Sequence, residues 1–223
     1  LTSNSWGGGG FSQALYDTIL YAQGKNQLFV AAAGNDGQNI DVNNSYPAGY
    51  DLPNIVSVAA SDTGDARASF SNYGATRVDL AAPGVGILST LPNNGYAAWS
   101  GTSMATPHVT GAVAFAAMNF PGDSVAARRQ RILAGVDWKP ALQGKVVTGG
   151  RLNLLRVIDA DGDGVADWQP VITTASVGRA VLGDVYSNPI HAIHGAAPYT
   201  WSLEAGGLPS GLALGGGGVV AGT

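Results

Sequence analysis

The stretch of residues 101–119 constrains the fold of this chain more than any other segment. It opens on Gly101 and continues through Thr102 and Ser103 into a run with apolar residues on nearly every side of a helix. Other elements normally cover a helix that is apolar all round, so we expect residues 102–119 to form a buried central helix. Ser103 would lie in its first turn, where unpaired N–H groups favour negative charge beside the hydroxyl. A nucleophile would use that position, and an ordinary helix-capping serine is the alternative interpretation.

A second informative segment is the apolar run of residues 28–33, which ends in Gly34-Asn35-Asp36-Gly37. The pattern predicts a buried parallel strand followed by a turn at its carboxyl end, where open α/β sheets bind their ligands. Asn35 lies in that turn. The alternative is a turn asparagine that merely tolerates left-handed backbone geometry.

Both segments match one family. Residues 101–109, Gly-Thr-Ser-Met-Ala-Thr-Pro-His-Val, resemble the nucleophile signature of the subtilisin-like serine proteases, the subtilases, and residues 32–35 resemble their Ala-Ala-Gly-Asn motif. The resemblance implies that Ser103 attacks the scissile carbonyl and that the Asn35 amide donates to the oxyanion of the tetrahedral intermediate. Such a donor stabilises the transition state by about 3 to 4 kcal/mol, a magnitude known from a subtilisin asparagine.

A third match, Asn4-Ser5-Trp6-Gly7-Gly8, resembles the family's Ser-Leu-Gly segment, which pairs with the substrate backbone and walls the primary specificity pocket. Trp6 departs from the commoner Leu. Main-chain pairing of this kind supplies affinity, and the side-chain pockets supply selectivity. The resemblance implies two facing sets of substrate-binding residues: Ser5, Trp6 and Gly7 on one side, and Ala32, Ala33 and Gly34 on the other.

Tyr46-Pro47-Ala48 resembles the family's turn at the floor of that pocket, which holds a cis proline. An ordinary trans bond is the alternative, because only about 5–6% of X–Pro bonds are cis. Ser45 would lie near the pocket base. Neither it nor Asn44 is charged, so no buried acid that would select basic residues is evident.

The histidines do not supply a catalytic triad, whose order in subtilases is Asp, His, Ser. At about 100° per residue, His108 points roughly 140° away from Ser103 on one helix and is expected to be structural. His191 and His194 fall in a segment of different composition and are expected at the surface. The resemblance therefore implies that the chain is a fragment, with the catalytic Asp and His encoded upstream.

The expected architecture of residues 1–157 is the C-terminal part of a subtilisin-like α/β domain, an incomplete doubly wound parallel sheet. Apolar periodicity and capping residues predict helices at 12–24 and 124–134, and short apolar runs predict strands at 55–60 and 78–82. The arginines of the second helix are expected on its solvent-facing side.

Residues 158–169 form an acidic linker that resembles the calcium loops of thrombospondin type 3 repeats. Alternating carboxylates around glycines are hard oxygen ligands, which calcium requires. An EF-hand is excluded because Pro170 occupies the position of its terminal Glu. The expected calcium ligands are the carboxylates of Asp159, Asp161, Asp163 and Asp167 and the carbonyl of Val165. A solvated acidic spacer is the alternative.

Residues 170–223 change to short strands with turn residues between them, such as residues 199–203 and 219–223. They resemble the immunoglobulin-like repeats of bacterial surface and secreted proteins. The resemblance implies a C-terminal all-β immunoglobulin-like sandwich, truncated here, that binds a surface or matrix ligand.

Composition limits the classes of partner that the chain is expected to bind. The 223 residues carry a net charge of −4, and the only basic cluster is Arg128, Arg129 and Arg131, which argues against a nucleic-acid or anionic-membrane partner. No apolar run reaches the roughly 18 residues of a membrane span. The absence of cysteine leaves the compartment open, and the resemblance implies secretion to the cell surface or beyond it.

The favoured function is a serine endopeptidase that acts on protein or peptide substrates. The alternative is an extracellular adhesion or scaffold protein with a degenerate protease fold. An α/β-hydrolase that uses Asp184 and His191 fails, because Ala105 stands where the nucleophile elbow needs glycine. A sedolisin-type peptidase would carry Asp in place of Asn35.

Overall fold

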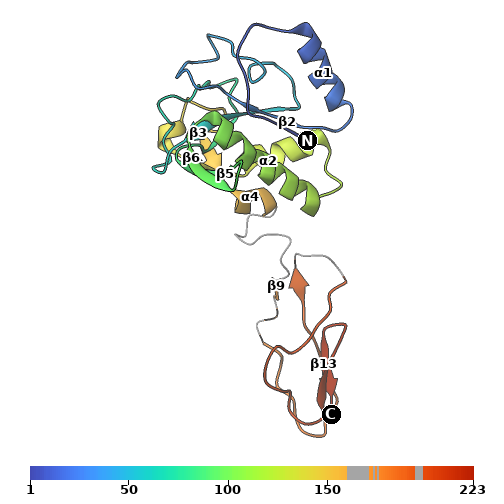
Figure 1. Ribbon diagram of the computed structural model, residues 1–223. Helices are drawn as coiled ribbons and strands as arrows, with labels where there is room; N and C mark the ends of the chain where they lie inside the picture. Colours follow the sequence, from blue (N-terminus) through green and yellow to red (C-terminus); the bar gives the residue numbers. More distant parts are fainter. Residues whose placement is uncertain (160–170, 173, 175, 194–197) are drawn as a thin grey trace. The chain divides into compact units, whose positions relative to one another are not determined.

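The computed structural model describes residues 1–159, 171–172, 174, 176–193 and 198–223. They fall into two compact units, Leu1–Ile158 and Asp159–Thr223 (Figure 1).

The first unit is built on a six-stranded sheet of order β1-β2-β3-β4-β8-β7. Its first five strands are parallel, and β7 runs antiparallel to β8. Every residue of β2 and β3 is buried, as expected of strands covered on both faces. In sheet order, the strands are β1 (Thr2–Asn4), β2 (Phe29–Ala32), β3 (Ile55–Ser61), β4 (Leu80–Pro83), β8 (Gly150–Leu152) and β7 (Val136–Trp138).

Helices cover both faces of this sheet. In Figure 1, α1 (Gln13–Gln23) lies on one side of β2 and β3, and α2 (Thr102–Asn119) with α4 (Leu154–Ile158) lies on the other. The helix α3 (Val125–Ala134) packs against α2 and α4. A single 3-10 turn spans Pro140–Leu142. The predicted doubly wound α/β arrangement is confirmed for this unit.

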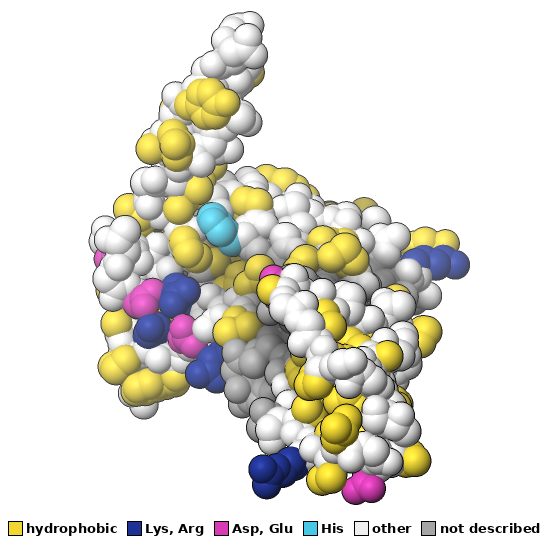
Figure 2. Space-filling model, turned by 90° about the horizontal axis from the view of Figure 1, so that it is seen from below, with side chains coloured by type: hydrophobic (Ala, Val, Ile, Leu, Met, Phe, Trp, Pro, Cys, Tyr) yellow, Lys and Arg dark blue, Asp and Glu magenta, His cyan; other side chains and the backbone are white. Residues whose placement is uncertain are grey.

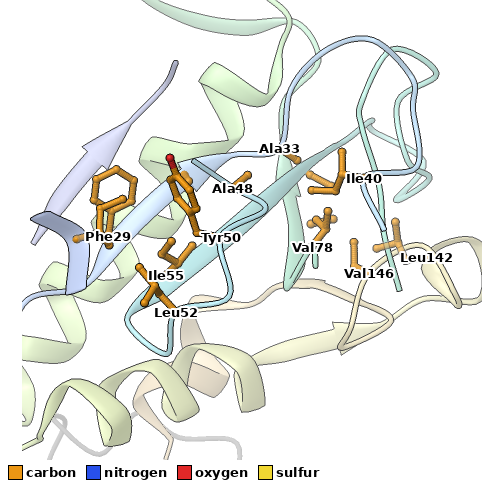
Figure 3. Packing of buried hydrophobic residues seen from close by; sticks show 14 residues of the cluster. Phe29, Ala33, Ile40, Ala48, Tyr50, Leu52, Ile55, Val78, Leu142 and Val146 are labelled. Carbon is orange, nitrogen blue, oxygen red and sulfur yellow. The ribbon is translucent and has the colours of Figure 1, made fainter. Parts of the chain in front are cut away.

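The core on the α1 side of the sheet is shown in Figure 3. In it, Phe29 of β2 and Ala33, which follows β2, pack with Ile55 of β3. Tyr50 and Val78, from the connections between strands, belong to the same cluster. The two predicted helix starts are confirmed, because Ser12 accepts from Leu15 N at 3.4 Å and Ser124 accepts from Ala127 N at 3.2 Å. These caps satisfy N–H groups that the first turn leaves unpaired.

The expectation that α2 is buried all round is wrong for one of its faces. Pro107, His108, Gly111, Ala114 and Met118 are exposed, and Met118 keeps 67% of its surface accessible. The helix packs its other side onto β1, β2, β3 and β4. Ala and Gly at these positions make the helix read as apolar throughout, although only part of it lies under the sheet.

A hairpin precedes α2. Its strands β5 (Ile87–Leu91) and β6 (Gly95–Trp99) pair antiparallel through a turn in which Asn93 and Asn94 have φ of 62° and 59°. Asparagine tolerates this left-handed geometry better than most residues do. The side chains of Leu88, Tyr96 and Trp99 are exposed on the hairpin.

The described residues of the second unit form only antiparallel strand pairs. One sheet has the order β10-β13-β12, and a second pairs β9 with β11. These strands are β9 (Val171–Ile172), β10 (Tyr186–Pro189), β11 (Ala192–Ile193), β12 (Leu212–Gly215) and β13 (Val219–Gly222). His191 is exposed there, and His194 lies outside the described residues.

Candidate active site

Ser103 is the second residue of α2, directly after Thr102 and the capping residue Gly101. Its side chain is half-buried, and its Oγ donates to the carbonyl of Ser5 at 3.2 Å. The hydroxyl of Ser5 donates in return to the Ser103 carbonyl at 2.8 Å. These two hydrogen bonds join the segment after β1 to the first turn of α2.

Asn35 follows β2 and Gly34, and its side chain is exposed. Its Oδ1 accepts from the backbone N–H of Thr102 at 2.8 Å and from the Thr102 hydroxyl at 3.0 Å. Both bonds end on the amide oxygen, so the amide N–H₂ is the group left to donate. Asn35 and Ser103 line the same cavity, of about 320 Å³.

Thr102 connects the two segments, a role that the sequence motifs do not predict. Its side chain is fully buried, and its Oγ1 accepts from Gly34 N at 3.2 Å as well as donating to Asn35. One hydroxyl can do both, since it offers one donor and two acceptor sites. The only sequence signal for this role is its place directly before Ser103.

Asn72 was also missed, and it shapes the turn that carries Asn35. This buried amide accepts from Asp36 N at 3.0 Å and Gln38 N at 2.9 Å, and it donates to the Ala33 carbonyl at 2.9 Å. A Cβ on Gly34, whose φ is +105°, would come within 2.3 Å of the Asn72 amide nitrogen. Only glycine fits here without displacement.

Most of the residues predicted to bind the substrate line the cavity beside Ser103. Ser5, Trp6, Gly7, Ala32 and Gly34 line it, whereas the Ala33 side chain lies in the core (Figure 3). Alternate residues of a strand point to opposite faces, which separates Ala33 from its two neighbours. The other lining residues are Gly8, Asn35, Asp36, Ser45, Thr102 and Ser103.

The Tyr46–Pro47 peptide bond is cis, as the resemblance implies. The carbonyl of Tyr46 accepts from Gly8 N at 3.0 Å, which joins this turn to the segment after β1. Ser45 lies on the cavity wall, next to the turn.

His108 is exposed on α2. Its Nδ1 lies 2.9 Å from the carbonyl of Met104, one turn back along the helix. Together with Ser103, Ile87 and Leu88, it lines a second cavity, of about 350 Å³, beneath the hairpin.

Among the described residues, three groups of ion pairs lie outside the cavity, one of them Asp123 with Arg131 at 3.0 Å. Asp65 binds Lys139 at 2.7 Å and Arg151 at 2.5 Å, and Asp137 binds Arg151 at 3.2 Å and Arg156 at 2.9 Å. On the face shown in Figure 2, acidic and basic side chains likewise lie side by side. The hydrogen bond from Lys139 lowers the pKa of Asp65, and the one from Asn153 lowers the pKa of Asp137.

The remaining group is the pair of Asp79 with Arg129, joined at 2.6 Å. Burial raises the pKa of the Asp79 carboxyl, while Arg129 and the N–H of Ser57 act in the opposite direction. Arg129 was expected to face solvent with its helix neighbours. It instead reaches inward from α3 and also donates to the carbonyl of Ile55 at 2.9 Å.

The predicted calcium ligands cannot be placed together, because Asp161, Asp163, Val165 and Asp167 lie outside the described residues. Asp159 is half-buried at the start of the second unit. Within the described ranges, no three His, Cys, Asp or Glu side chains gather into a group that could hold a metal ion. In those ranges there is also no helix with the length and apolar character needed to cross a membrane.

Comparison with curated proteins finds subtilases. The chain is 48% identical over 109 residues to thermitase from Thermoactinomyces vulgaris and 42% identical over 129 residues to subtilisin DY from Bacillus licheniformis. These matches cover 49% and 57% of this chain but 37% and 46% of the two relatives. The chain thus spans less than half the length of either protein.

Solved structures resemble about two thirds of this chain. A protease from Pseudoalteromonas arctica superposes with a TM-score of 0.64 at 29% identity, over 70% of this chain and 50% of that one. A cold-adapted subtilisin-like serine proteinase gives 0.61 at 35% identity, over 68% and 54%. Residues 1–149 match the subtilase family itself, and the chain therefore belongs to this family of serine proteases.

Proposed function

We propose that this chain supplies the nucleophile and the oxyanion hole of a serine endopeptidase. The observation that carries the proposal is the orientation of Asn35, whose amide oxygen is engaged by Thr102 while its N–H₂ remains for a ligand in the cavity that Ser103 lines. Ser103 Oγ attacks the peptide carbonyl to form an acyl-enzyme. The carbonyl oxygen, which becomes negative, accepts from the Asn35 amide and the Ser103 N–H.

The base and the acid of this reaction are proposed to lie upstream of residue 1. A histidine takes the proton of Ser103 Oγ and returns it to the leaving amine, and an aspartate orients that histidine. The geometry of His108 supports this assignment, because its Nδ1 contacts the Met104 carbonyl and not Ser103. The hydrogen bond from Ser103 Oγ to Ser5 must give way when the base engages it.

The substrate is proposed to be an extended peptide. Its main chain pairs with residues 5–7 as an added strand, opposite residues 32–34. The side chain of Ala33 is in the core, so Ala32 and Gly34 are the residues of this set that line the cavity. The side chain before the scissile bond enters the cavity beside Ser103.

The test is labelling of the full-length protein, meaning this chain together with its upstream half, by a fluorophosphonate probe. We expect Ser103 to be labelled and the Ser103→Ala variant to lose labelling and peptide hydrolysis while it keeps its fold. Ser69→Ala is the matched control, because Ser69 is exposed and lines neither cavity beside Ser103, so its hydroxyl should not affect turnover. The 223-residue chain alone should be labelled far more slowly, since its triad is incomplete.

A folded full-length protein that is neither labelled nor active would favour the scaffold function instead. We further propose that residues 170–223 are an immunoglobulin-like module of a secreted or cell-surface protein. The antiparallel pairing of its described strands supports this. Binding of the isolated full-length protein to extracellular matrix or cell-surface material, lost when residues 170–223 are removed, is the corresponding measurement.

The acidic linker is proposed to bind one calcium ion. Four carboxylates and the Val165 carbonyl are a donor set suited to this cation, which would neutralise their mutual repulsion and order the segment. Calorimetry and limited proteolysis, with calcium or with chelator, test it. Heat of binding with protection near Ala166 is expected, and equal cleavage without heat would leave an acidic spacer.

A further inference from the structure

Among the described residues, Asp36 is the one charged residue on the wall of the cavity beside Ser103. Its backbone N–H donates to the buried amide of Asn72 at 3.0 Å, so the position of the residue is fixed. Its side chain is exposed, and it belongs to none of the ion pairs found in the described ranges. The carboxylate is therefore available to a ligand. The rest of the wall is Gly, Ala, Ser, Thr, Asn and Trp, which are all neutral.

An aromatic ring lines the same cavity. Trp6 stands edge-to-face with Phe29, with ring centroids 6.3 Å apart, and still exposes 51% of its surface. The contact with Phe29 supports the indole from one side and leaves much of it open to a ligand. The electron-rich face of an indole attracts a cation more strongly than that of any other side chain.

We propose that this cavity selects a cationic side chain, Lys or Arg, at the substrate position before the scissile bond. Asp36 pairs with the charge, and Trp6 packs against the charged group or its aliphatic stem. The inference rests on the proposed function and names its substrate class. No acid is needed at the pocket base near Ser45, because the recognising carboxylate lies in the turn after Asn35. An exposed carboxylate gives moderate selectivity that falls with ionic strength.

The experiment compares kcat/KM of the full-length protein for paired peptide substrates that differ only in arginine or citrulline before the scissile bond. Citrulline keeps the shape of arginine and removes its charge. We expect the wild type to favour arginine by about fivefold, in the range of exposed ion pairs, and Asp36→Asn and Asp36→Ser to abolish that preference. Trp6→Leu should reduce it by about threefold at most. Asp36→Glu should keep it.

Asp17→Asn is the matched control, because it removes the same charge from the exposed side of α1, outside the cavity. The ratio of the two kcat/KM values is the readout for the Asp36 and Trp6 variants, because both residues line the cavity. Circular dichroism of each variant reports folding. Equal rates for the two substrates in the wild type, or an arginine preference that survives both neutral variants, would overturn the inference. Failure to cleave either substrate, with Ser103 unlabelled, would instead overturn the proposed function.

Discussion

Thr102 holds the side-chain amide of Asn35 by two hydrogen bonds to the same oxygen, one from its backbone N–H at 2.8 Å and one from its hydroxyl at 3.0 Å. The two residues are 67 positions apart in the chain, and they meet where β2 ends and α2 begins. Donors aimed at a developing charge are most effective when they are fixed before the reaction starts. Thr102 is thus a positioning residue for the proposed oxyanion hole.

Replacing Thr102 by Val removes the hydroxyl and keeps the size of the side chain. The backbone bond to Asn35 remains, so the amide is held by one bond where it had two. We expect kcat of the full-length protein to fall about tenfold with little change in KM, a fraction of the 10²–10³ lost when an oxyanion donor is removed outright. Steady-state kinetics measure this. Thr102→Ser should restore kcat, and an unchanged kcat in Thr102→Val would remove the positioning role.

Much of the first unit could be predicted from contiguous sequence. The strand before Asn35, the helix after Gly101 and the cis bond at Pro47 each belong to a short motif whose residues are neighbours in the chain. The residues that hold the candidate site in place instead make contacts with residues far away in the sequence. Asn72 reaches Ala33 across 39 positions, and Arg129 reaches Asp79 across 50. No local pattern encodes such contacts, because they depend on how the strands are ordered in the sheet.

The exposed face of α2 is another feature that the sequence pattern does not predict. Ala and Gly are apolar in a helical pattern but are small enough to lie at a surface at little cost, so Gly111 and Ala114 carry no signal of burial. For Asp36 the sequence predicts only a place in a turn. Its place on the cavity wall depends on Asn72, which fixes its backbone.

A second prediction concerns Gly34. Alanine there would combine a φ of +105° with a Cβ that lies 2.3 Å from Asn72 Nδ2. We expect Gly34→Ala to lower the free energy of unfolding by about 3 kcal/mol, since backbone strain and a steric clash add. Urea unfolding of the full-length protein in a Ser103→Ala background, which prevents self-digestion, gives the value.

Gly86→Ala is the control for Gly34, because its φ is +66° and nothing lies within 4 Å of the added Cβ. Only the backbone term applies there, so a loss of about 1 kcal/mol is expected. Equal losses for the two variants would show that the contact with Asn72 adds nothing.

A third prediction concerns Asp79 and Arg129. Arg129→Met leaves the carboxylate of Asp79 buried without its partner, and we expect a loss of about 3 kcal/mol in the free energy of unfolding near pH 7. Burial already raises the pKa of Asp79, and removing Arg129 raises it further. A raised pKa means that the folded state holds the proton more tightly, so the variant regains stability as pH falls.

Urea unfolding across pH measures the cost of Arg129→Met. The double variant with Asp79→Asn should recover most of the loss at pH 7, because no buried charge remains. A loss of equal size at pH 4 and pH 7 would be inconsistent with an unpaired carboxylate as its cause.

The last prediction concerns the loss of folding stability at acidic pH. The pKa of Asp65 is lowered first by its hydrogen bond with Lys139, and that of Asp137 by its hydrogen bond with Asn153, from an ordinary value of 3.8. A carboxyl with a lowered pKa contributes stability that is complete above its unfolded pKa and is lost as pH falls through its folded pKa. Both side chains are about a quarter exposed, so each contribution should be only about 0.5–1 kcal/mol.

The double variant Asp65→Asn/Asp137→Asn should therefore lose stability at pH 6 and show a shallower decline below pH 4 than the parent. High salt should shrink the difference at pH 6 by screening these ion pairs. Parallel curves for variant and parent between pH 2 and pH 6 would mean that the network does not couple protonation to folding.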